Sequence, residues 1–251
     1  MLRTARIVSI LGDADNGIFQ AKRVKLLFHE GYEHSAYAKK LNDTDFLIEI
    51  LCATLGREMG LPIPEPVIAI SIDGTEAWFG SLDAKHPDLS RRLDIEGTNI
   101  LNTPKSNATL KLLSQWPQIE EAINFDEWIA NADRNPGNVL FDGKESYSLI
   151  DHNQAMRLPF ASHAPINNQL LNIKLAFNGD EIARQRLKNK VSVIIDGIDQ
   201  ALPRTIADGM SQQIDEIDNE LLSNMVDFLE QRLIKLSHIN QEKVPTQQMS
   251  S

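Results

Sequence analysis

The chain has 251 residues, 42% of them hydrophobic, which is enough for one large domain or for two lobes around a shared cleft. Its 25 basic and 35 acidic residues give a net charge of −10, and this balance disfavours a nucleic-acid groove or an anionic membrane as partner. No apolar run reaches the roughly 18 residues of a membrane span. The single cysteine, Cys52, cannot form a disulfide within the chain, which is typical of a reducing compartment, and we expect it to be a buried, unreactive thiol. We therefore expect a cytoplasmic protein.

The first forty residues predict three strands. Residues 7–11 and 18–28 have apolar or alternating patterns on either side of a glycine-containing turn, and residues 35–39 resume the strand pattern. Lys39 and Lys40 end this third strand and must point to opposite faces. The register decides which lysine faces the interior, and both could equally be solvated residues of an edge strand.

Residues 42–56 predict a capped helix. Asn42–Asp45 is a capping sequence, and the helix that follows is almost wholly apolar. Glu49 is the only charged residue within residues 46–55, and a buried acid needs a partner. An ion pair with Lys39 would supply one, whereas exposure at the helix edge is the alternative.

The next elements are a hairpin and then a helical region. Two strands, residues 67–72 and 76–79, are joined around Asp73-Gly74, which is a strong hairpin signal. Beyond Leu82 the chain becomes more polar, so we place a boundary there. Helical periodicity recurs in four later segments: residues 106–131, 167–177, 181–200 and 211–239.

The most informative stretch is Asn131–Asn138, followed by Leu149–His152. Its Asn-Pro-Gly run is turn chemistry through which a helix cannot continue. Residues 139–141 and 147–150 then predict a short hairpin around Asp142-Gly143. This order places one carboxylate before a loop, an amide after it and a second carboxylate beyond the returning strand.

Phosphoryl transfer needs this combination of groups. A carboxylate, here Asp133, can orient or deprotonate an acceptor hydroxyl, while an amide oxygen and a second carboxylate, Asn138 and Asp151, can hold Mg²⁺ against nucleotide phosphates. Turn capping is the alternative role for any one of these residues. His152 could orient Asp151 or make only a local structural hydrogen bond.

The run Asp-Arg-Asn-x-Gly-Asn with a following Ile-Asp-His resembles the HipA-like kinase family, whose fold is related to those of protein kinases and phosphatidylinositol kinases. Trp128–Asn131 and the Leu-Gly-x-x-x-Gly-Leu-Pro-x-Pro run at residues 55–64 add to the resemblance. It implies an α+β, two-lobed, protein-kinase-like fold. We expect a small β-rich N-lobe of an antiparallel sheet and one helix, a mainly helical C-lobe and a disordered tail: residues 1–82, 83–240 and 241–251.

The resemblance also assigns residues. It implies that Asp133 is the catalytic base and that Asn138 and Asp151 bind the metal. It further implies that Lys39 anchors the nucleotide phosphates and is steadied by Glu49. The segment Gly80, Ser81 and Leu82 falls where a kinase hinge receives adenine, and the turn containing Gly12 and Gly17 falls where kinases place a phosphate lid.

The expected activity is therefore ATP- and Mg²⁺-dependent transfer of a phosphate to a Ser/Thr hydroxyl of a protein. A small-molecule hydroxyl is the alternative acceptor, and a pseudokinase that uses its cleft for protein contacts is the alternative function. The sequence has no counterpart of the extra N-terminal subdomain of HipA toxins, so neither a toxin role nor an antitoxin partner follows.

Overall fold

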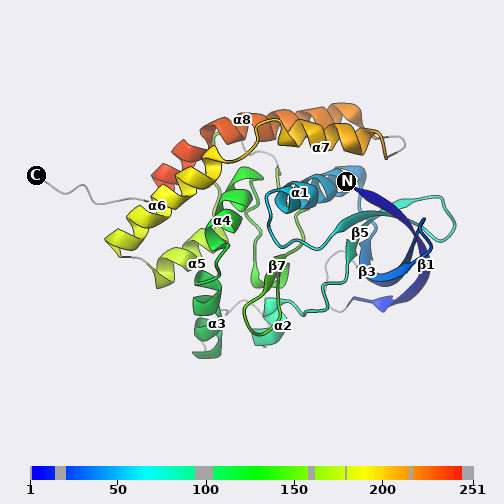
Figure 1. The fold of residues 1–251 in the computed structure, drawn as a ribbon, viewed down its shortest axis with the longest axis horizontal. Helices are drawn as coiled ribbons and strands as arrows, with labels where there is room; N and C mark the ends of the chain where they lie inside the picture. The colour runs from blue at the N-terminus through cyan, green and yellow to red at the C-terminus, as the bar shows by residue number, and fades with distance from the viewer. Residues whose placement is uncertain are drawn as a thin grey trace, which may run out of the picture. The chain divides into compact units, whose positions relative to one another are not determined.

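The computed structural model describes residues 2–14, 21–93, 104–157, 162–178, 180–214 and 217–244. The fold is mixed α/β, with a β-rich N-terminal region and a mainly helical remainder (Figure 1). The strands are β1 (Arg3–Asp13), β2 (Lys22–Phe28), β3 (Glu33–Lys39), β4 (Pro66–Ile70), β5 (Ala77–Leu82), β6 (Val139–Phe141) and β7 (Tyr147–Leu149). The helices are α1 (Asp43–Glu58), α2 (Leu89–Leu93), α3 (Pro104–Ser114), α4 (Ile119–Trp128), the 3-10 turn η1 (Pro136–Asn138), α5 (Gln169–Phe177), α6 (Glu181–Asp196), α7 (Leu202–Ser211) and α8 (Asn219–Lys243).

The chain folds into two compact units. The first unit consists of Met1–His86, Ser148–Asn153 and Leu202–Val226. The second unit consists of Pro87–Tyr147, Gln154–Ala201 and Asp227–Ser251. The chain thus crosses from one unit to the other within β7 and within α8, and each unit is described by itself.

Five strands of the first unit close into a barrel in the order β1-β2-β3-β5-β4. Four of the pairs are antiparallel, but β1 runs parallel to β4, so the expected antiparallel sheet differs at this pair. β1 has 11 residues and register shifts at Ile7/Ser9 and Ile10/Gly12. Such irregularities bend a strand and increase its twist, which allows β1 to pair along both of its edges.

The barrel interior follows from alternation along the strands. Val24, Leu26 and Phe28 of β2 are buried, as are Ala36 and Ala38 of β3. Because successive side chains point to opposite faces, the buried alanines of β3 leave Tyr37 outside. The same alternation sets the directions of the lysines that follow Ala38.

Helix α1 packs within the first unit. Asn42 caps it, its side chain accepting a hydrogen bond from the Asp45 amide at 2.9 Å. The helix is apolar on nearly all sides and almost completely buried, as such helices must be, and Cys52 lies buried in it as predicted. Helix α7, from much later in the chain, also packs against α1 within this unit. The sequence pattern missed α7, a short helix with a proline in its first turn.

The second unit is built around α4. This helix contacts α5 and α6 (Figure 1). The Nε1 atom of Trp128 donates to the carbonyl of Leu229 in α8 at 2.9 Å. The predicted hairpin is present as the two-stranded sheet β6-β7. Helix α8 continues to Lys243 and so enters the segment expected to be a tail, whereas residues 245–251 lie outside the described part.

None of the described helices combines the length and the apolar character required to cross a bilayer.

Candidate functional site

The end of α4 delivers the chain to Asp133. The helix stops at Trp128, Ala130 adopts a left-handed backbone with φ of 52°, and the Asn131 amide donates back to the Asp126 carbonyl at 2.8 Å. A non-glycine residue in this region costs about 1–3 kcal/mol and persists only where its surroundings hold it. The turn is therefore dictated by packing around α4 rather than by local preference.

The turn η1 brings Asn138 back to Asp133. Asn135 caps the turn by accepting from the Gly137 amide at 2.8 Å, and Pro136 occupies its first position. The Nδ2 atom of Asn138 donates to the Asp133 carbonyl at 2.7 Å and lies 3.5 Å from Asp133 Oδ2. The amide nitrogen thus faces Asp133, which leaves Oδ1 of Asn138 as the oxygen that could hold a cation. The Asp133 side chain itself is exposed.

A buried ion pair supports this loop from inside. The Arg134 and Asp126 side chains have no exposed surface, and the guanidinium binds both carboxylate oxygens, Nε to Oδ2 at 3.0 Å and Nη2 to Oδ1 at 2.9 Å. Arg134 Nη1 also donates to the Asn138 carbonyl at 3.0 Å. Sequence reasoning missed both residues. The available signal was an acid within the apolar face of a helix, followed by an arginine in the loop.

Lys39 and Asp151 lie together in the first unit. Lys39 Nζ is 2.9 Å from Asp151 Oδ1, and both side chains are largely shielded from solvent. Lys40 points the other way and pairs with Glu76 at 2.5 Å on the surface. Of the two lysines that the sequence left open, Lys39 is therefore the one directed at a predicted site residue.

Glu49 is buried and pairs with His152 instead of Lys39. Glu49 is 1% exposed, and its Oε1 atom is 3.4 Å from His152 Nδ1. The expected Lys39–Glu49 ion pair is not formed between these two described residues, and exposure of Glu49 at the helix edge is also wrong. Burial raises the pKa of Glu49, but the interaction with His152 and the charge of Lys39 outweigh burial and lower this pKa below its ordinary value.

Gly80, Ser81 and Leu82 belong to strand β5 rather than to a loop. They pair with β3 on one side, and Gly80 and Ser81 pair with β4 on the other, while the Leu82 amide donates to the Glu65 carbonyl at 3.0 Å. A Cβ at Gly80 would lie 3.1 Å from the Val67 carbonyl, so close strand packing explains this glycine. Adenine recognition by these backbone groups stays a prediction, and the ladder leaves them fewer unused donors than a loop would have.

The candidate site is thus described as two halves. Asp133 and Asn138 lie together in the second unit, and Lys39, Glu49 and Asp151 lie together in the first. The convergence predicted for the base and the two metal ligands involves both units and stays a prediction. The proposed phosphate lid falls largely on residues 15–20, outside the described part of the chain.

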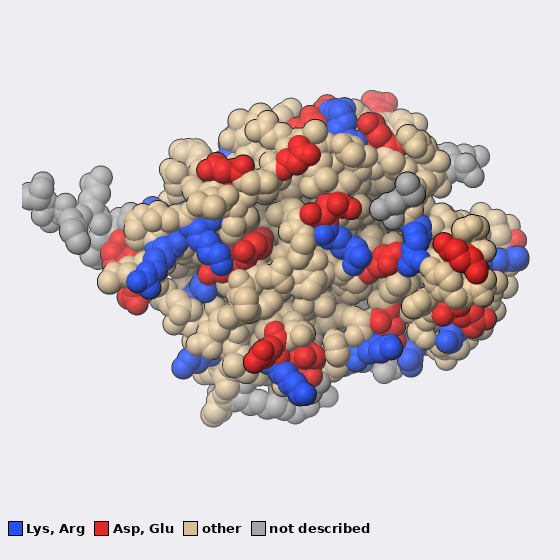
Figure 2. Space-filling view, viewed as in Figure 1, with Lys and Arg blue, Asp and Glu red and all other residues tan. Residues whose placement is uncertain are grey.

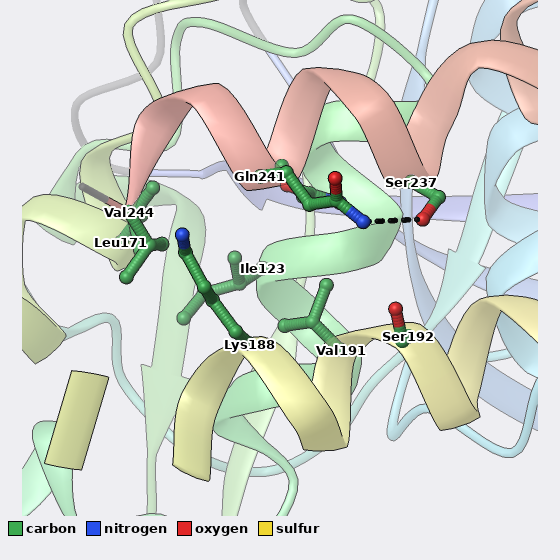
Figure 3. A pocket seen from close by; sticks show the side chains of 9 residues that line it. Ile123, Leu171, Lys188, Val191, Ser192, Ser237, Gln241 and Val244 are labelled. Atoms are coloured by element: carbon green, nitrogen blue, oxygen red, sulfur yellow. Dashed lines mark hydrogen bonds between the residues drawn. The ribbon is translucent and has the colours of Figure 1, made fainter. Parts of the chain in front are cut away.

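A pocket in the second unit contains none of the predicted site residues. Its empty volume is about 290 Å³, open solvent included, and aliphatic side chains such as Ile123 and Val191 line much of it (Figure 3). Lys188 and Gln241 lie at its polar parts, and Gln241 Nε2 donates to Ser237 Oγ at 3.5 Å. The pocket is a gap between helix side chains and has no arrangement of groups suited to phosphate chemistry.

Charge is mixed on the surface. On the face drawn in Figure 2, basic and acidic side chains of the described residues are interspersed. The net charge of −10 is therefore not gathered into one acidic patch on this face.

Each half carries groups that phosphoryl transfer uses: an exposed carboxylate beside an oriented amide in the second unit, and a lysine beside a second carboxylate in the first. The chain belongs to the HipA-like kinase family, whose model matches residues 27–239. No curated protein matches it. It is similar in fold to the crystal structure of the Helicobacter pylori proinflammatory kinase CtkA, with 14% identity, a TM-score of 0.53, and 97% of this chain and 98% of that chain covered.

Proposed function

We propose that the protein is an ATP- and Mg²⁺-dependent kinase that transfers the γ-phosphate to a Ser/Thr hydroxyl of a protein. Membership of the HipA-like kinase family supports phosphoryl transfer. The observation that carries the residue assignment is the hydrogen bond of Asn138 to Asp133, which sets an amide oxygen and an exposed carboxylate at one turn. Family resemblance is the support for a protein acceptor.

In this proposal Asp133 accepts a hydrogen bond from the acceptor hydroxyl, orients it and receives its proton. Asn138 Oδ1 and an Asp151 carboxylate oxygen would hold Mg²⁺, which favours hard oxygen ligands and needs few from the protein. The cation supplies charge neutralisation of the phosphates when bound. Lys39 anchors phosphate oxygens, exchanging its ion pair with Asp151 for one with the nucleotide.

The test is labelling with [γ-³²P]ATP of a Ser/Thr-containing protein mixture by wild type, by Asp133→Ala and by Glu145→Ala. Glu145 is exposed in the β6–β7 turn and is the matched control for loss of a nearby carboxylate. We expect transfer by wild type and by the control, and a loss of at least about 10³-fold in Asp133→Ala, as for removal of a catalytic base.

Two other results would redirect the assignment. Label on a low-molecular-mass alcohol but not on protein would favour a small-molecule kinase. No transfer to any acceptor, together with melting that does not respond to ATP and Mg²⁺, would contradict the proposal and favour a pseudokinase.

A further inference from the structure

The residue that follows Asp151 is anchored in the protein interior. His152 and Glu49 are each 1% exposed, and their contact, Nδ1 to Oε1, is 3.4 Å. The neighbouring contact, Lys39 Nζ to Asp151 Oδ1, is 2.9 Å. Two acids and two nitrogen bases thus make two close contacts in the first unit, Lys39 with Asp151 and His152 with Glu49, while the charge of Lys39 also acts on Glu49.

The backbone at Asp151 needs such an anchor. Its φ of 61° lies in the left-handed region, which aspartate tolerates better than most residues but which still costs backbone energy that neighbouring contacts can offset. On the N-terminal side, the Leu149 amide donates to the Pro62 carbonyl at 3.0 Å. On the C-terminal side, the buried His152 ring lies against Glu49 of α1, with Nδ1 3.4 Å from Oε1. The chain is therefore fastened on both sides of Asp151.

We propose that Glu49 is a positioning residue that acts through His152: the buried pair holds the Asp151 backbone in its left-handed conformation and so directs the Asp151 carboxylate. The importance of that direction for cation binding rests on the proposed function. This role differs from that of a glutamate that steadies Lys39, because Lys39 is held by Asp151 itself.

A purely structural role for the pair is the competing explanation. A buried carboxylate requires a partner, and His152 would satisfy Glu49 without any consequence for Asp151. The two explanations differ in what happens at Asp151 when the pair is broken in a protein that remains folded. They also differ in which pairs of substitutions are coupled.

The first experiment needs no nucleotide. The backbone ¹³C chemical shifts of Asp151, which report its φ and ψ, are measured by NMR in wild type, Glu49→Gln, His152→Leu and Lys39→Met. Lys40→Met is the matched control, because Lys40 is the adjacent lysine and pairs with Glu76 at the surface. We expect the Asp151 shifts to leave their wild-type values in the first two variants and to keep them in both lysine variants.

His152→Gln covers the case in which His152→Leu does not fold. Glutamine retains an N–H donor for Glu49, so we expect it to restore the Asp151 shifts at least in part. Wild-type Asp151 shifts in a folded Glu49→Gln variant would overturn the inference, as would shifts that move equally in Lys40→Met.

The second experiment measures the affinity for ATP with Mn²⁺ by calorimetry. Loss of residues that orient a metal ligand lowers metal affinity by about 10- to 100-fold, and we expect this for Glu49→Gln and for His152→Leu. The double variant Glu49→Gln/His152→Leu should lose no more nucleotide affinity than the weaker-binding of the two single variants. In the double variant Glu49→Gln/Lys39→Met, the fold-losses in nucleotide affinity of the two single variants should instead multiply.

The reverse pattern, with Glu49 coupled to Lys39 and independent of His152, would overturn the inference while leaving the proposed function intact. If wild type binds no nucleotide, the proposed function fails, and the chemical shifts of Asp151 still decide whether Glu49 acts through His152.

Discussion

The direction of the Asp133 side chain depends on the residue beside it. Arg134 is buried whereas Asp133 beside it is exposed, and the Asn135 amide donates to the Asp133 carbonyl at 2.7 Å, which closes a tight turn at Arg134. Arg134 donates three hydrogen bonds to the Asp126 carboxylate and one to the Asn138 carbonyl. At the level of single residues, the loop is therefore positioned by a charge pair that is itself wholly buried.

Replacement of Arg134 by leucine should destabilise the protein by about 3–5 kcal/mol, because Asp126 would be left as an uncompensated buried charge. Denaturant unfolding measures this change. Arg134→Lys should also lower the free energy of unfolding, since a lysine cannot reproduce the bidentate contact with Asp126. Arg134→Leu/Asp126→Leu should recover part of the loss, and a double variant as unstable as the sum of the two singles would contradict this account.

Among the elements, the 3-10 turn η1 is short enough that one methyl group affects it. A Cβ at Gly137 would lie 2.9 Å from Asn135 Oδ1, the atom that caps the turn. The turn in turn sets the position of Asn138 relative to Asp133. The geometry of η1, rather than its burial, therefore affects the candidate site.

Gly137→Ala should therefore lower phosphate transfer by about tenfold or more, as small displacements of positioned groups do, with a stability loss of about 1 kcal/mol. Gly209→Ala is the matched control. It lies in α7 with open space where the Cβ would be placed, so the same change should stabilise by about 0.5–1 kcal/mol. Steady-state rates and thermal unfolding of both variants test this, and equal activity in the two would refute it.

The helices α4, α5 and α6 are joined by one carboxylate. Glu120 of α4 lies 2.9 Å from Lys174 of α5 and 3.1 Å from Lys190 of α6. Burial raises the pKa of Glu120, but the two lysines outweigh burial and lower its pKa below 4.5. A carboxyl group whose folded pKa is depressed stabilises fully above its unfolded pKa and loses this contribution as the pH falls through the folded value.

Glu120→Gln should lower the free energy of unfolding at pH 7, and the difference from wild type should shrink as the pH falls below about 4.5. Glu121→Gln, which changes the adjacent acid with only a 3.9 Å contact to Lys190, should have a smaller effect. Unfolding curves between pH 3 and 7 give both differences. A gap between wild type and Glu120→Gln that stays constant over this range would contradict the assignment.

For the molecule as a whole, a ligand that binds only the folded chain raises its stability by mass action. At about 100 times its dissociation constant, a ligand adds about 2.7 kcal/mol to the free energy of unfolding. ATP with Mg²⁺ should therefore raise the melting temperature of the wild-type protein by several degrees.

Removal of Mg²⁺ with EDTA should abolish most of this shift, because phosphate and the Asp151 carboxylate would then repel one another. The melting temperature of Asp151→Ala should rise only slightly with ATP, whether or not Mg²⁺ is present. Thermal unfolding followed by fluorescence makes the comparison, with Lys40→Met as the variant that keeps the wild-type response. A shift that EDTA leaves unchanged would exclude a metal-dependent nucleotide site.

Much of the local structure could be read from the chain. The apolar run after the Asn42 cap predicted a helix, and Asp142-Gly143 between short apolar runs predicted a hairpin; both are present. The family could also be recognised, because the spacing of Asp133 and Asn138 around Asn-Pro-Gly is set by local turn chemistry. These features depend on residues close together in sequence, where propensity and capping act directly.

The sequence did not predict which residues distant along the chain pair with one another. Glu49 visibly needed a partner, but the choice of His152 over Lys39 depends on how α1 meets the segment after β7. The parallel pairing of β1 with β4 and the packing of α7 on α1 likewise depend on closure of the barrel and on long-range burial. The order of residues along the chain establishes which groups are available for phosphate chemistry and how they are spaced. The packing of helices and strands establishes which charge pairs with which, because that choice is made by distances between elements that no local pattern encodes.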